Sequence, residues 1–177
     1  MQFESYRLGK VDRKIDIIEP CLRNTNIVSI DFKSIKASEL NFIHNFPNGF
    51  QSSQICTISR YAGISNRVSS IGIFDVFNNE ISYALLSQLI WYFIEGFCLR
   101  IEEDPYSKDF KGNSYYVSIG DQQLKFYNSD LSQKWWVELD NNSKNNTLIP
   151  CNNKDYIDAC NQIISERILL SFKRNFV

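Results

Sequence analysis

The chain has 177 residues, a mass of 20.7 kDa and a formal net charge of −1, from 19 basic and 20 acidic residues. Apolar residues make up 44% of it and aromatic residues 14%, which provides material for a large core and excludes disorder throughout. The balanced charge excludes the broad basic field that drives nonspecific nucleic-acid binding, so we expect no nucleic-acid partner.

The N-terminal part predicts alternating helices and strands. Apolar residues at helical spacing indicate a short helix over residues 11–24, which Pro20 breaks or ends. The run 27–32 (IVSIDF) is short, apolar and rich in β-branched residues, which is typical of a strand buried on both faces of a sheet. A loop is expected over residues 36–51 because it holds Asn, Pro and Gly in close succession.

The alternation continues to about residue 101. Ser52 and Ser53 are expected to cap a helix that stops at Gly63, and a second strand is expected over residues 69–77. A long helix follows over residues 80–101. Its uncharged stretch is shorter than the roughly 20 residues that span a bilayer, so we expect a buried helix and no membrane segment. Strands that alternate with helices imply a parallel sheet with helices on its faces.

The remainder of the chain changes character. Two extended runs flank Gly120 and Asp121, which predicts a hairpin, and two more extended runs follow at 134–139 and 147–151. Helices are expected from about residue 153 to 164 and from 166 toward 172. The predicted fold class is therefore α/β, with a parallel sheet and flanking helices over residues 1–104 and a small antiparallel β and helix extension over residues 105–177.

Trp135 and Trp136 are neighbours in the third extended run of this extension. Because side chains alternate across a strand, the two rings point to opposite faces of the sheet. We expect at least one of them to pack against the long helix near Trp91 and Phe93.

The cysteines and the single histidine indicate no catalytic or metal site. The five cysteines are scattered and contain no CxxC pair, so neither a disulfide scaffold nor a zinc knuckle is expected. The N-terminus is charged and has no apolar h-region, which favours a reducing, cytoplasmic location. His44 is the only histidine and is interpreted as an ordinary loop residue.

Two carboxylates lie near the ends of the predicted parallel strands, Asp31 on the first and Asp75 on the second. Sites in parallel sheets form at the carboxyl ends of strands, so the pair indicates an active-site rim. The alternative is a pair of solvated strand-end carboxylates, and both interpretations stay open at this point.

Several motifs resemble the ureohydrolase family, which contains arginases, agmatinases and formimidoylglutamases. The runs SIDFK (29–33), PNGF (47–50) and GIFDVFN (72–78) are similar to the C-terminal half of that family. A second set resembles a bacterial formimidoylglutamase-like branch with a C-terminal extension: CTISRYAGISNRVSSIGIFDV, QLIWYFIEGF, KWWVEL and LIPCNNKDYIDAC. The resemblance covers nearly the whole chain and implies a partial arginase-like sheet.

The resemblance also implies a metal site, which this chain matches in part. Active members hold two manganese ions, and an Asp-x-Asp motif at a strand end supplies two of the ligands. Asp31 matches the first of these, whereas Lys33 replaces the second, and an ammonium group repels a cation. Asp75 corresponds to a glutamate near the substrate. Nothing in the chain corresponds to the family's histidine and Asp-x-His-x-Asp ligands, so we expect no tightly bound manganese.

The resemblance thus implies a truncated or split member of a family that hydrolyses a C–N bond of guanidino or formimino compounds with a metal-bridged hydroxide. We expect this chain to be inactive by itself, although the family is one of hydrolases. The alternative is a noncatalytic protein-interaction module that keeps the same scaffold and binds through the aromatic extension. The expected partners are a second copy of the chain or a separately encoded N-terminal half.

Overall fold

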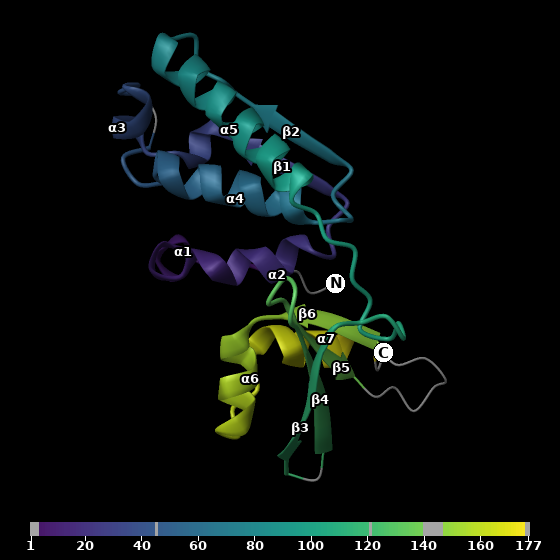
Figure 1. The fold of residues 1–177 in the computed structure, drawn as a ribbon. Coiled ribbons are helices and arrows are strands. Elements are labelled where there is room, and N and C mark those ends of the chain that lie inside the picture. The colour runs from purple at the N-terminus through teal and green to yellow at the C-terminus, as the bar shows by residue number, and fades with distance from the viewer. Residues whose placement is uncertain (1–3, 45, 121, 140–146, 176–177) are drawn as a thin grey trace. The chain divides into compact units, whose positions relative to one another are not determined.

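The computed structural model describes residues 4–44, 46–120, 122–139 and 147–175, and it confirms the α/β class (Figure 1). It contains a two-stranded parallel sheet and a four-stranded antiparallel sheet. Contacts divide the chain into two compact units, one of Tyr6–Glu102 and one of Glu103–Val177 together with Met1–Ser5. Each unit has its own apolar core.

The first unit opens with short helical pieces where one helix was predicted. They are α1 (Leu8–Arg13), a 3-10 turn (Ile15–Ile17) and α2 (Ile18–Leu22). Lys14 separates them, because its φ of −150° lies outside the helical region. Pro20 does not end a helix: it sits in the first turn of α2, where backbone N–H groups have no partner within the helix.

The parallel sheet consists of β1 (Ile27–Asp31) and β2 (Ser70–Phe74), with Asp31 opposite Phe74 at the carboxyl edge. The expectation that β1 is buried on both faces is wrong. Val28 and Ile30 are buried among apolar residues of the helices, whereas the alternate residues of β1 face solvent. The helices of this unit cover one face of the sheet, and on the other face Ile27, Ser29 and Asp31 of β1 are exposed.

Between the strands lie a 3-10 turn (Phe32–Ser34), α3 (Ala37–Leu40) and α4 (Ser52–Ile64). Helix α3 occupies part of the predicted loop. Gln51 caps α4 in place of the predicted serines, and it exchanges hydrogen bonds with Gln54 in a capping box. Gly63 does not stop α4 but lies inside its last turn.

Helix α5 (Glu80–Cys98) follows β2 and lies beside α4 (Figure 1). Asn79 caps it, because its side chain accepts a hydrogen bond from the Ser82 backbone at 2.8 Å. The expectation of a buried helix is wrong, since α5 buries one narrow stripe and leaves most of its apolar surface exposed. A chain with two strands and one neighbouring long helix offers α5 too little surface to cover all sides.

The second unit is the predicted meander. The strands β3 (Gly112–Ile119), β4 (Gln122–Ser129), β5 (Trp135–Leu139) and β6 (Thr147–Cys151) pair antiparallel in that order. Gly120, with a φ of 56°, lies in the hairpin turn, and Asp121 lies outside the described residues. Helices α6 (Asn153–Cys160) and α7 (Glu166–Asn175) pack on one face of the sheet, and α6 ends four residues earlier than predicted.

Candidate functional site

The carboxyl edge of the parallel sheet is the place where the sequence predicts chemistry. Asp31 ends β1, and its carboxylate accepts a hydrogen bond of 2.8 Å from the Lys33 backbone N–H. The Ser34 hydroxyl donates to the Asp31 carbonyl at 2.6 Å. These two bonds shape the turn after β1, so the Asp31 side chain serves as a cap of that turn.

Asp75 directly follows β2 and has a φ of 53°, in the left-handed region that non-glycine residues seldom adopt. Its carboxylate forms an ion pair with the Lys33 ammonium, and both side chains remain about half exposed. Lys33 therefore contacts both predicted site residues. Its backbone N–H bonds to Asp31 and its side chain bonds to Asp75.

The charges at this edge favour a protonated lysine. The hydrogen bond to Asp75, then the charge of Asp75 and more weakly that of Asp31, hold the pKa of Lys33 above its ordinary value of 10.5. A lysine that keeps its proton at neutral pH is a poor nucleophile and a poor base. The ammonium acts here as a fixed positive charge between two loops.

These residues do not fit a manganese centre. The Asp75 carboxylate is paired with the ammonium of Lys33, and the Asp31 carboxylate accepts a hydrogen bond from the Lys33 backbone N–H. Across the described parts of the chain, no three His, Cys, Asp or Glu side chains gather in a way that would hold a metal. Manganese prefers several carboxylate, carbonyl or imidazole ligands, which this edge does not supply.

His44 lies on the loop between α3 and α4 and is exposed. Its ring makes an edge contact with Phe42 at a centroid distance of 5.5 Å, and Phe42 stacks on Phe77. This packing matches the interpretation of an ordinary loop residue.

A second candidate site lies on α5 and was missed by the sequence reasoning. We call it the outer face of α5 and define it by large apolar side chains that are each about half exposed or more: Tyr83, Ile90, Trp91, Ile94 and Phe97. Trp91 is 68% exposed. A helix that is apolar all round is normally buried, either in a protein core or in a membrane. The sequence shows that this helix is apolar, because between Glu80 and Glu95 it has no charged residue, but it does not show which side of the helix is exposed.

The opposite side of α5 is fixed tightly to α4. A Cβ on Gly63 would lie 2.2 Å from the Phe93 carbonyl oxygen, and one on Gly96 would lie 2.3 Å from that of Arg60. The two backbones therefore touch at these glycines. The buried Ser59 hydroxyl donates to the Leu89 carbonyl at 2.7 Å, which adds a polar bond across the helix pair.

The flank of the helix pair carries one ion pair, in which the Arg60 guanidinium lies 3.0 Å from the Glu95 carboxylate. Within the described residues, α5 is long and apolar enough for a membrane span, and only 22% of its most apolar window is buried. Core helices of soluble proteins satisfy the same two criteria but are mostly buried, and length and composition alone assign no membrane role.

In the second unit, the aromatic residues pack on one another. Trp135 stacks on Tyr156 at 4.9 Å and on Tyr115 at 5.7 Å, whereas the buried Trp136 meets the edge of Phe110 at 6.1 Å. These ring partners all lie between residues 103 and 177. The expected packing of a tryptophan against α5 stays a prediction.

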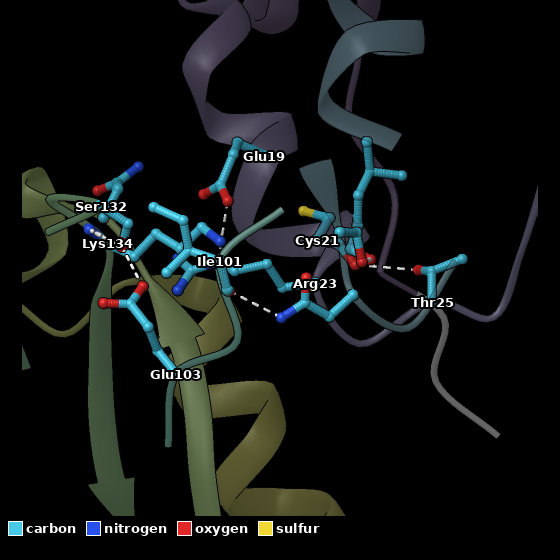
Figure 2. A network of polar contacts seen from close by, with 12 residues as sticks. Glu19, Cys21, Arg23, Thr25, Ile101, Glu103, Ser132 and Lys134 are labelled. Carbon is cyan, nitrogen blue, oxygen red and sulfur yellow. Dashed lines mark hydrogen bonds and ion pairs between the residues drawn. The ribbon is translucent and has the colours of Figure 1, made fainter. Parts of the chain in front are cut away.

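Figure 2 shows polar contacts made by residues of both units. In the first unit, the Arg23 guanidinium lies 3.1 Å from the Glu19 carboxylate one turn earlier in the helical segment. In the second unit, Glu103 accepts hydrogen bonds from the hydroxyls of Ser129 and Ser132. Glu103 thereby fixes the turn between β4 and β5. Both networks have a structural role.

Comparison with known proteins gives a distant likeness. No protein family and no curated protein matches the sequence. Two crystal structures of oxidized formiminoglutamase from Trypanosoma cruzi with Mn2+, at pH 6.0 and pH 8.5, share 18% identity with the chain at a TM-score of 0.48. The match covers 53% of this chain and 36% of that enzyme, so the chain spans about a third of its length. At this level the likeness fixes neither a reaction nor a ligand for this chain.

Proposed function

We propose that the chain is a noncatalytic protein-interaction module, and that the outer face of α5 is its binding surface. The observation that carries the proposal is the exposure of five large apolar side chains on one helix whose other side is already packed. Monomeric proteins seldom expose apolar patches of more than a few hundred Å², and larger patches mark interaction sites. A protein partner would remove this surface from water.

The scaffold is proposed to be part of a ureohydrolase sheet, on the strength of the motifs around Asp31, Asp75 and the aromatic extension. This chain alone is then a truncated or split relative of formimidoylglutamase that does not hydrolyse amidines. The ion pair of Lys33 with Asp75 supports this proposal, because it places an ammonium where the family would hold a metal ligand. A cytoplasmic location is part of the same proposal, since all five cysteines are free thiols.

Site-specific photo-crosslinking tests the binding surface in the cells that make the protein. A benzophenone amino acid replaces Trp91 in one variant and Ile157, an exposed apolar residue of α6, in a control variant. We expect the first to give a discrete protein adduct on irradiation and the control to give none. We also expect the adduct to disappear when Ile94→Asp is added, because a charge there would have to be desolvated in the interface.

The proposal is contradicted by an absence of adducts at position 91, by equal adducts at both positions, or by adducts that survive Ile94→Asp. The catalytic alternative has its own readout. Wild-type chain supplied with manganese and a guanidino or formimino substrate is expected to release neither urea nor formamide above the metal-only background.

A further inference from the structure

We infer that the partner on the outer face of α5 is the α5 helix of a second copy of this chain, in an antiparallel two-fold contact centred on Ile90. The inference rests on the proposed function and names the occupant of the same surface. It depends on the spacing of the exposed residues, on the area that they offer and on how their sizes match across a two-fold axis.

Four of the five exposed apolar residues, together with the exposed Ser87, follow the spacing of a helix–helix seam, and Trp91 lies beside it. Positions 83, 87, 90, 94 and 97 are separated by alternating steps of four and three, which keeps them on one stripe and is the repeat used in coiled coils. We call this stripe the outer seam. The buried stripe of α5 against α4 follows the same rule at Ser82, Leu85, Leu89 and Gly96. A second seam of this kind is suited to another helix, and less so to a flat sheet or a loop.

The exposed area is close to what a stable dimer needs. Large apolar side chains present on the order of 200 Å² each, so five that are about half exposed offer roughly 500–600 Å². The exposed Ala84, Ser87 and Cys98 lie between these large side chains and add to the exposed area. A standard interface buries about 800 Å² on each partner.

An antiparallel arrangement matches the side chains by size. With the two-fold axis at Ile90, Tyr83 lies beside Phe97 of the second copy, and the small Ser87 lies beside the larger Ile94. Large residues opposite small ones fill an interface without voids. A parallel pairing would put Ser87 against Ser87 and leave a gap. The antiparallel pairing also places the positive end of each helix dipole beside the negative end of the other.

Charge does not oppose this contact. The outer seam contains no ionisable group except the Tyr83 phenol, whose hydroxyl donates to the Asn78 side chain at 2.7 Å. The charged Glu95 lies on the flank with Arg60 and away from the seam. Two copies therefore meet without like charges facing each other, which a self-complementary interface requires.

Disulfide trapping of the purified protein tests the contact. Ile90→Cys is made in a background in which the exposed Cys98 and Cys160 are replaced by Ser. Two cysteines at a two-fold axis come within bonding distance, so mild oxidation is expected to convert most of the chain to a covalent dimer. The matched control is Gln88→Cys, which is exposed on the same helix but off the seam. It is expected to give a dimer yield at least fivefold lower.

Adding Ser87→Asp to the Ile90→Cys variant separates interface loss from misfolding. Ser87 is exposed, so the variant is expected to keep the helical circular dichroism of the parent and to lose the dimer. Equal trapping at positions 88 and 90, or dimers that survive Ser87→Asp, would overturn the inference.

Two further outcomes distinguish the inference from the function on which it rests. If Ile90→Cys stays monomeric while position 91 still gives an adduct with a different protein in cells, the second copy is excluded and the interaction module stands. If the protein floats with phosphatidylcholine vesicles and gives no protein adduct, both are overturned, because the outer face then binds lipid.

Discussion

Lys33 decides the chemistry of the carboxyl edge of β1 and β2. Its ammonium pairs with Asp75 and its backbone N–H bonds to Asp31, so a single residue engages both carboxylates. A positive charge at this place stabilises two acidic groups that would otherwise repel each other at neighbouring strand ends. Asp75, whose side chain the ion pair fixes, has a left-handed backbone conformation that non-glycine residues seldom adopt.

Manganese binding is predicted to be weak. Calorimetry with the wild-type chain is expected to show no site of micromolar or better affinity, since one carboxylate is paired and the other caps a turn. Lys33→Gln serves as the control and is expected to bind only weakly, because two carboxylates are not a complete ligand set. Two manganese ions bound tightly by the wild type would refute the proposed loss of the metal centre.

The pKa of Lys33 provides a second test at the residue scale. The pKa of Lys33 is higher in the folded protein than in the unfolded chain. The ion pair therefore stabilises the fold fully at a pH below the pKa of the unfolded chain, and this stabilisation is lost as the pH rises through the pKa of the folded protein. We expect Asp75→Asn to lower the pKa of Lys33 toward 10.5 and Asp31→Asn to lower it less. NMR titration of the lysine side chain measures both shifts, and equal shifts would contradict the stated geometry.

At the scale of elements, the α4–α5 pair depends on two glycines in contact. Side chains at Gly63 or Gly96 would collide with backbone oxygens, which cannot rotate away as a flexible side chain does. The glycine contact determines which side of α5 faces α4. The outer seam lies on another side of the helix and is therefore exposed. The glycines therefore determine both the stability of the pair and the orientation of the binding surface.

Gly96→Ala is predicted to destabilise the first unit by about 1–3 kcal/mol, as overpacking at a tight contact does. This loss exceeds the gain in helix propensity, which is about 1 kcal/mol at most. Gly9→Ala is the matched control, since nothing lies within 4 Å of its Cβ position in α1. Urea unfolding compares the two, and an unchanged midpoint for Gly96→Ala would refute the close approach of the helices.

Trp136 is expected to stabilise the second unit. It is 8% exposed and packs on Phe110, so Trp136→Ala is predicted to cost about 3–5 kcal/mol. Trp91→Ala is the control of the same residue type, and it is expected to leave the unfolding midpoint of the protein at low concentration nearly unchanged, because Trp91 is exposed. Equal losses for both would show that α5 is covered within the monomer.

The elements differ in how far the sequence could predict them. The hairpin around Gly120 and the order of β3 to β6 follow from local alternation and turn residues, and the structure confirms them. The exposure of α5 could not be predicted, since the sequence shows that a helix is apolar but not how much surface its neighbours offer. The ion pair of Lys33 with Asp75 joins residues 42 positions apart, so only the paired strands reveal it.

For the whole molecule, the first unit leaves strand edges without a partner in its sheet and one apolar helix face exposed. The parallel sheet has two strands, so each has one edge without a partner in that sheet, and β1 turns its alternate residues to solvent. The outer seam of α5 is the apolar one of the two features. Unpaired strand edges invite pairing with another chain, and apolar helix faces invite packing, so both features point to association.

Light scattering at micromolar concentration tests the central claim, that a second copy of the chain covers the outer face of α5 in solution. The account predicts a particle of about twice the chain mass of 20.7 kDa for the wild type and a folded monomer for Ile94→Asp. A wild-type monomer of 20.7 kDa that unfolds in one cooperative step would contradict it, because the outer face would then be stable in water by itself.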